Sequence, residues 1–352
     1  MKKLILAIIL CICLIIPSAA QRNSREGSKR QFAVYGVAFY NLENLFDTIN
    51  SNGTYDLEYS PRGSRQWDGR KYWAKINNMA TAISNMTTQT TPNGPAIIGV
   101  SEIENKSVLD DLVKADPIKR WMLQVVHHDS PDRRGVDVGL LYNPRMFRVL
   151  DVTNHLLSIP DNPKFRTRDQ MCVTGILGGD TVSVIVNHWP SRLGGQEQSS
   201  YLREAAAALS RHIADSLWAI RPNQGVIVMG DLNDDPMDTS CAVTLGAVRN
   251  ERDAKLHGFY NPWWKLLDSG IGTLAYKGQW NLFDQIIVSG TLLKDNRPDG
   301  LHYWKCQVNN FEFLRDNAGT RQGYPLRTFA SGVWLNGYSD HYPTEIFLIR
   351  ER

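Results

Sequence analysis

The sequence is poor in cysteine and has almost no excess of charge of either sign. Its 352 residues include five cysteines, and 39 Lys and Arg stand against 36 Asp and Glu, which gives a formal net charge of +3. So few thiols exclude a small disulfide-rich scaffold, and so balanced a charge excludes a polycation, so that any polyanionic partner must be bound by a local patch. Internal repeats, low-complexity tracts and an interdomain linker are also missing, which favours a single folded domain. With 42% hydrophobic and 21% charged residues, the composition excludes a disordered or fibrous chain.

Long hydrophobic runs are absent apart from one near the N-terminus. Leu4–Ile16 is uninterrupted and apolar, follows two lysines and precedes a Pro-Ser-Ala-Ala sequence. A membrane-spanning helix needs about 20 apolar residues, so this shorter run predicts a secretory signal, with an uncleaved anchor as the alternative. We therefore expect a signal peptide over 1–20, a flexible leader over 21–31 and the folded domain over 32–352. The mature protein is expected to be exported to the periplasm or the exterior and not to insert into a membrane.

Removal of a signal peptide would leave three cysteines, Cys172, Cys241 and Cys306. Three thiols allow at most one internal disulfide, and which two would pair stays open. Their spacing fits no zinc site.

Short apolar runs alternate with helical patterns along the rest of the chain. Apolar residues recur at helical spacing over 73–83 and 202–217, which predicts two amphipathic helices. Short runs bounded by Gly, Pro, Asn or Asp are typical of strands buried in a layered fold. The strand-like runs are Val34–Tyr40, Ala96–Val100, Val138–Tyr142, Val182–Val186, Val226–Met229 and Gln285–Val288. Together these patterns predict an α/β fold.

Polar residues gather at the ends of these strands. In layered α/β folds ligands bind at strand ends, and residues two apart in an extended chain face the same way, so that Asn41 with Glu43 and Asp231 with Asn233 can point together. Carboxylates that converge in one pocket repel unless a cation lies between them, and oxygen ligands suit Mg²⁺, or Mn²⁺, better than zinc. Histidines nearby add proton transfer near neutral pH. The set therefore predicts metal-assisted attack of water on a phosphate ester.

The ordered motifs FYNLENLFD, GVSEIEN, VDVGLLY, VNHWPSR, VMGDLND, FDQIIVS and YSDHYP resemble the endonuclease/exonuclease/phosphatase superfamily, the DNase I-like fold. The resemblance covers roughly residues 33 to 350 and is nearest to the secreted nuclease branch. It implies a four-layer α/β sandwich in which two mostly antiparallel sheets are flanked by helices. Asn281–Gln285 departs from the block typical of inositol phosphatases, which argues against that branch.

The resemblance also implies roles for individual residues. Asp231 and Asn233 would position the nucleophilic water and the phosphate, and His188 would contact the phosphate or protonate the leaving oxygen. Asp284 would orient His341, which is either the general base or a clamp on the transition state. The residues implied in metal binding are Glu102, Asn41, Glu43 and Asp340.

Substrate contacts are predicted from basic and aromatic residues near these motifs. Arg192 follows His188 closely and is well placed to meet a phosphate; Arg134, Arg168 and Trp264 are further candidates. Ser60–Lys75 interleaves cations with aromatics, a pattern that suits nucleic acid but also suits a helix with an aromatic core face and a solvated charged side. His127 and His128 are expected to be exposed and inert, with a surface metal contact as the alternative.

These observations favour an exported, Mg²⁺-dependent phosphodiesterase that acts on nucleic acid as a monomer. A phosphatase or a phospholipid phosphodiesterase of the same fold is the first alternative. A non-catalytic surface binding protein is the second, and it is disfavoured because every expected polar position is filled.

Overall fold

The structure, a computed structural model, describes residues 31–49 and 56–351. The expected signal peptide lies outside these residues, as does the expected leader apart from Gln31. Phe32–Arg352 clusters as one unit. Within the described ranges, no helix has the length and apolar character that crossing a membrane requires.

Two large sheets carry most of the strands. The first has the order β14-β17-β1-β2-β4-β3 and the second the order β5-β6-β7-β8-β13-β10-β9. The strands of the first sheet are β14 (His302–Val308), β17 (Thr344–Glu351), β1 (Phe32–Leu45), β2 (Ile97–Ile103), β4 (Asp137–Tyr142) and β3 (Gln124–His127). Those of the second are β5 (Phe147–His155), β6 (Gln170–Leu177), β7 (Asp180–His188), β8 (Gly225–Asp231), β13 (Asp284–Ser289), β10 (Phe259–Tyr260) and β9 (Ala247–Val248). Two small hairpins are formed by β11 (Leu274–Tyr276) with β12 (Gln279–Asn281) and by β15 (Phe329–Ala330) with β16 (Val333–Trp334).

Neighbouring strands in both sheets are mostly antiparallel. The parallel pairs are β1 with β2, β7 with β8 and β9 with β10. The first two of these pairs matter for function, because parallel strands bring their carboxyl ends to the same edge of a sheet. The predicted pair of mostly antiparallel sheets is confirmed.

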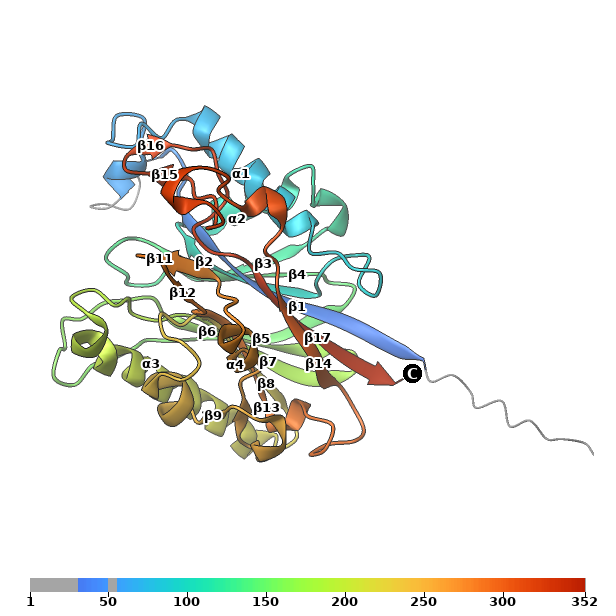
Figure 1. Cartoon of the computed structure of the whole chain (residues 1–352). Coiled ribbons are helices and arrows are strands. Elements are labelled where there is room, and N and C mark those ends of the chain that lie inside the picture. The colour runs from blue at the N-terminus through green and yellow to red at the C-terminus, as the bar shows by residue number, and fades with distance from the viewer. Residues whose placement is uncertain (1–30, 50–55, 352) are drawn as a thin grey trace, which may run out of the picture. The chain divides into compact units, whose positions relative to one another are not determined.

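Alternating apolar residues on the strands build a core on each side of each sheet. On β1, Val37 and Phe39 face a cluster shared with the second sheet, whereas Ala38 and Tyr40 face a cluster shared with helices. The helices are α1 (Gly69–Ser84) and α2 (Lys106–Lys114) beside the first sheet, α3 (Gln196–Ile220) beside the second, and the short α4 (Trp264–Asp268). Figure 1 shows α1 and α2 on one side of the paired sheets and α3 on the other. The predicted four-layer sandwich is therefore confirmed.

The sequence patterns located these elements well. Five of the six predicted strand runs lie within β1, β4, β7, β8 and β13, and the sixth, Ala96–Val100, overlaps β2, which begins one residue later at Ile97. The two predicted helices lie within α1 and α3. Side-chain caps fix two helix starts: Asp68 accepts from the Lys71 backbone N–H at 2.9 Å, and Asn105 from that of Val108 at 3.1 Å. All three cysteines of the domain are free thiols.

One buried carboxyl group in β17 is expected to make stability depend on pH. Glu345 accepts a hydrogen bond from Gln307 Nε2 at 3.1 Å, but its other oxygen has no hydrogen-bond partner among the described residues, and burial raises the pKa of Glu345 to about 8. Because the folded pKa exceeds the unfolded one, this residue's contribution to stability is present below the unfolded pKa of about 4.3 and is lost as the pH rises through about 8. Glu345→Gln is therefore expected to gain thermal stability over the wild type as the pH rises from about 5 to about 8.5. Thermal unfolding at both pH values measures this, and a difference in melting temperature that does not change with pH would contradict it.

Candidate active site

The polar ends of five strands meet at one edge of the two sheets. Asn41 lies on β1 and Glu102 on β2, whose carboxyl ends are parallel neighbours. His188 and Asp231 are paired in register at the ends of β7 and β8, and Asp284 begins β13 directly opposite Asp231. The topology therefore brings together residues that are far apart in the sequence.

Asp231, Asp284 and His341 form the centre of this site. One ligand atom from each lies within 4.8 Å of the others, and all three residues are buried. His341 Nδ1 is hydrogen-bonded to Asp284 Oδ2 at 2.7 Å, and its Nε2 lies 3.8 Å from Asp231 Oδ2. Asn41 Nδ2 donates to the same Asp231 oxygen at 3.0 Å. The expected orientation of His341 by Asp284 is therefore present in the geometry.

The two histidines of the site are held in opposite charge states. Burial alone would lower the pKa of His341, but the carboxylates of Asp284 and Asp231 outweigh it and raise that pKa well above its ordinary value. Burial, together with the positive charges of Arg168 and Arg134, keeps the pKa of His188 well below its ordinary value. His341 is thus an imidazolium and His188 a neutral imidazole near pH 7.

Two carboxylates flank His188 in a way that fits a divalent cation. His188 Nε2 lies 3.6 Å from Asp231 Oδ2 and 3.9 Å from Glu102 Oε1. Burial raises the pKa of Asp231 to about 6, with negative charge on Asp284 and Glu102 adding to the shift and His341 opposing it. In addition, Asp284 Oδ1 is buried without a hydrogen-bond partner among the described residues. Crowded hard oxygen donors of this kind fit a cation such as Mg²⁺.

Local backbone distortions aim these side chains. β1 is bulged between Asn41 and Leu45, and β2 between Ser101 and Ile103. Glu102, inside the second bulge, has a left-handed φ of 58°, a conformation that costs a non-glycine residue about 1–3 kcal/mol. Bulges are a common means of re-aiming a side chain beside a functional site.

The first bulge separates two residues that were expected to point together. Glu43, with φ of 46°, turns to the backbone N–H of Thr328 at 2.7 Å and to Arg327 Nε at 3.3 Å, whereas Asn41 contacts Asp231. The rule that residues two apart share a face fails here because the strand is not regular. Glu43 is therefore not brought to the Asp231 cluster.

Asp340 and Asn233 each contact a residue of the Asp231 cluster and a residue outside it. Asp340 accepts from Arg327 Nη2 at 2.7 Å, and its other oxygen lies 3.9 Å from His341 Nε2. The backbone N–H of Asn233 donates to Asp231 Oδ1 at 3.1 Å, which fixes the carboxylate, while its side-chain amide donates to the Trp189 carbonyl. The Asp-x-Asn segment is thus a turn that orients Asp231.

Of the four predicted substrate contacts, Arg134 lies at the site. Its guanidinium is 3.4 Å from Glu102 Oε1 and is 40% exposed. Arg168 is buried, where it donates to the His188 carbonyl and pairs with Asp132. The other two have different partners. The Trp264 ring stacks with Arg249, the residue that follows β9, and Arg192 is bound to Asp234 and Asp238.

Sequence reasoning missed Arg327, and it named Lys75 only as one cation of the run Ser60–Lys75. Lys75 lies three residues after Tyr72 and four before Met79, on the apolar stripe of α1, and is 2% exposed. The expectation that the charges of this segment are solvated is therefore wrong for Lys75, and also for Lys71, which is 8% exposed. A lysine in register with an apolar stripe is the signal that could have revealed it. Burial lowers the pKa of Lys75, and the nearby Glu43 carboxylate opposes part of that shift.

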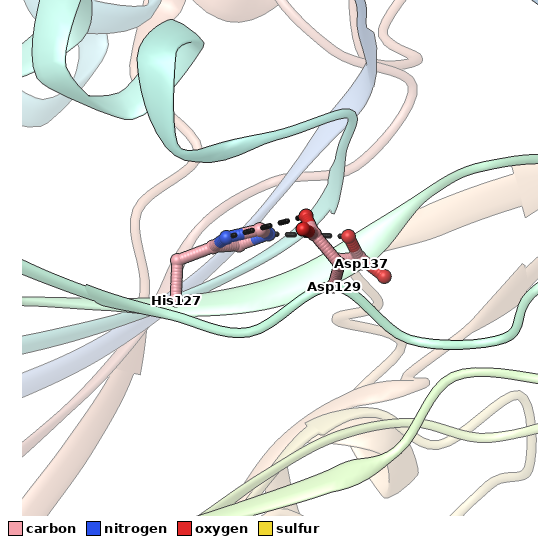
Figure 2. Close-up of side chains that lie close together, drawn as sticks. All are labelled: His127, Asp129 and Asp137. Atoms are coloured by element: carbon pink, nitrogen blue, oxygen red, sulfur yellow. Dashed lines mark hydrogen bonds and ion pairs between the residues drawn. The ribbon is translucent and has the colours of Figure 1, made fainter. Parts of the chain in front are cut away.

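A second group of one histidine and two aspartates lies outside this site (Figure 2). His127 Nε2 is 3.1 Å from Asp137 Oδ2, and its Nδ1 is 3.8 Å from Asp129 Oδ1. The imidazole is 4% exposed, so its predicted exposure is wrong. The Ser130 backbone N–H donates to the other oxygen of Asp137, so both carboxylate oxygens are engaged. The group thus closes the loop that carries Arg134.

Comparisons with known proteins agree with this fold. The model of the endonuclease/exonuclease/phosphatase family matches residues 36–350. Humanized D. rerio TDP2 has a TM-score of 0.56 at 12% identity, and the match covers 90% of this chain and 99% of that one. A Bacteroides thetaiotaomicron endonuclease/exonuclease/phosphatase family protein (TM-score 0.53, 16% identity, 92% and 97% covered) and a mannosyl-6-phosphatase from the same organism (0.53, 16%, 89% and 99%) are also similar. No curated protein matches the sequence significantly.

Proposed function

The chain belongs to the endonuclease/exonuclease/phosphatase family, and we propose that it is an exported, Mg²⁺-dependent phosphodiesterase that hydrolyses nucleic acid. Its family and fold are those of phosphoesterases. The observation that carries the proposal is the convergence of Glu102, Asp231, His188 and His341, whose ring nitrogens and carboxylate oxygens lie 3.6–3.9 Å apart. Mn²⁺ would fit the same oxygen donors.

The proposed mechanism assigns each residue a task in water attack on phosphorus. A divalent ion held by Glu102 and Asp231, with Asn41 beside them, would neutralise charge on the phosphate oxygens. Asp231 accepts the proton of the attacking water as the new P–O bond forms. The imidazolium of His341 donates a hydrogen bond to a phosphoryl oxygen, and neutral His188 holds the phosphate from the opposite side. The ester P–O bond then breaks, and the leaving oxygen takes a proton from solvent.

Three partly exposed arginines support a polyanionic substrate. Arg65, Arg134 and Arg327 are here called the arginine arc. Arg65 lies over the rings of Tyr59, in the short turn Asp56–Tyr59, and of Phe329, at 5.9 and 5.0 Å from their centroids, and Arg134 and Arg327 contact carboxylates of the site region. Their side chains are 26%, 40% and 39% exposed. A nucleic acid strand carries a charge at every phosphate, so the phosphates next to the scissile one would meet this arc. Such a local patch suits a chain of nearly balanced charge.

The substrate class is tested by incubating the mature protein with plasmid DNA, RNA, bis-p-nitrophenyl phosphate, p-nitrophenyl phosphate and sphingomyelin, in Mg²⁺ and then in EDTA. Nucleic acid cleavage that EDTA abolishes is the expected result. Activity on the monoester or the lipid alone would replace the proposal with a phosphatase or a phospholipid phosphodiesterase. No detectable hydrolysis of any of the five substrates, with several divalent metals, would favour a non-catalytic binding protein. Export is tested by the N-terminal residue of the protein recovered outside the cytoplasm, which is expected to be Gln21.

The arc makes a separate prediction for Arg65→Gln. This change is expected to raise the KM for an oligonucleotide by about tenfold to a hundredfold, the value of one or two charge-assisted hydrogen bonds, while KM for bis-p-nitrophenyl phosphate stays within about twofold. Steady-state kinetics on both substrates measure this. Arg62→Gln, an exposed arginine on the same loop outside the arc, is the matched control. Equal losses on both substrates would remove the arc from substrate binding.

A further inference from the structure

Glu43 is buried and enclosed by hydrogen-bond donors. Its side chain is 6% exposed, and Oε2 accepts from the Thr328 backbone N–H at 2.7 Å. Oε1 accepts from Arg327 Nε at 3.3 Å. A buried carboxylate needs such partners, because its ionised form loses the stabilisation of water.

The ammonium group of Lys75 completes this enclosure. The Lys75 side chain is 1% exposed, and Nζ lies 3.7 Å from Glu43 Oε2. The same nitrogen donates to Thr328 Oγ1 at 2.6 Å and to the Tyr338 carbonyl. An ammonium group has three hydrogens to donate, and three oxygens surround this one. Lys75 is therefore a built-in partner of Glu43 and has no exposed face that would let it bind substrate.

We propose that Lys75 is the resident cation of Glu43 and prevents a divalent ion from binding there. Metal binding is then confined to the Glu102 and Asp231 side of the site. This inference rests on the proposed function only in taking the site to be a metal site. Its physical basis is repulsion: a divalent ion on Glu43 would lie within a few ångströms of a buried positive charge, where water screens poorly.

Removing Lys75 should therefore create an ion site that the wild type lacks. Glu43 keeps Thr328 and the partly exposed Arg327 as partners in Lys75→Met, but it loses the buried positive charge. We expect this variant to bind one Mn²⁺ more per chain than the wild type. Glu43→Gln/Lys75→Met, which removes both charges together, should bind as many ions as the wild type, with affinity within about threefold.

The experiment counts Mn²⁺ bound to the full mature protein by equilibrium dialysis and by the loss of the free-ion EPR signal. Lys71→Met is the matched control, since Lys71 is buried on the same helix but donates to the Arg65 carbonyl, and it should bind as the wild type does. An unchanged count in Lys75→Met, or a double variant that loses an ion or more than about tenfold in affinity, would overturn the inference. Should Lys75→Met fail to fold, the charge-neutral double variant still decides whether Glu43 holds an ion.

These counts separate the inference from the proposed function. If the wild type binds Mn²⁺ but cleaves no nucleic acid, the proposed substrate is wrong, but the proposed role of Lys75 is unaffected. If the Glu43→Gln/Lys75→Met variant binds one ion fewer than the wild type, the proposed role of Lys75 is wrong, but the proposed nuclease activity is unaffected.

Discussion

Replacing His341 with alanine is expected to lower kcat by about 10²–10⁴-fold and to leave the protein folded. The imidazolium is fixed by Asp284 at 2.7 Å and faces Asp231 at 3.8 Å, so it is positioned for the reacting phosphate and has no strand or helix to hold together. Because its pKa lies well above the ordinary value, the loss should be similar at about pH 6 and about pH 8. Turnover of bis-p-nitrophenyl phosphate and thermal unfolding of the same variant measure the two halves of this prediction.

His127 supplies the control for this experiment. Its side chain is also buried and flanked by two aspartates, but it belongs to the second group, which closes the loop that carries Arg134. His127→Ala should therefore lower thermal stability while kcat falls by less than about tenfold. A kcat for His341→Ala within about tenfold of wild type would take His341 out of the mechanism.

The core of the site was predictable because it depends on topology that leaves a clear trace in the sequence. His188, Asp231 and Asp284 each lie within two residues of a short apolar run, and such runs are recognisable as strands. Once β7 and β8 are parallel neighbours and β13 runs back beside β8, these three residues must meet. The apolar runs and the order of the strands therefore account for the meeting of these three residues, and no side-chain contact has to be known.

The ionic partners of Arg192 and Glu43 could not be predicted from apolar runs. Arg192 has the right type and a position near His188, yet the turn after Asn233 surrounds it with Asp234 and Asp238. Glu43 is bound to Thr328 across 285 positions of sequence separation. A sequence reveals which residues carry charge, but which charge neutralises which is decided by loops whose path no periodicity determines.

Some strands were missed for physical reasons too. β5 is largely exposed on the outer edge of its sheet, so it lacks an apolar run, and β9 and β10 have two residues each, too few to show a period. Glu102 and Glu43 both lie in bulges near the end of a strand, but Glu102 points into the site and Glu43 binds Thr328 and Arg327 instead. The strand-end pattern therefore identifies candidates, and the bulges select among them.

The turn Asp231–Asp234, which follows β8 at the site, is expected to be stabilised by Arg203. This arginine is fully buried in α3. Its Nε forms an ion pair with Asp234 Oδ1 at 2.7 Å, and its two Nη atoms donate to Ser199 Oγ at 2.9 Å and to the Gln196 carbonyl. Arg203→Met fills a similar volume but leaves the Asp234 carboxylate buried, with only the partly exposed Arg192 as a cationic partner nearby. Removing one partner of a buried ion pair costs about 3–5 kcal/mol, so the free energy of unfolding in urea should fall by that amount.

The matched control is Arg211→Met on the same helix. Arg211 pairs with Asp215 one turn later, but both side chains are partly exposed, at 31% and 51%, and such pairs contribute less than about 1 kcal/mol. Because Asp234 directly follows Asn233, whose backbone N–H fixes Asp231, the loss of Arg203 should also lower kcat, whereas Arg211→Met should leave it unchanged. A loss of stability in Arg203→Met no larger than in Arg211→Met would mean that the buried pair does not hold the turn, and that the β8–β13 pairing with the donors Asn41 and Asn233 orients Asp231 without it.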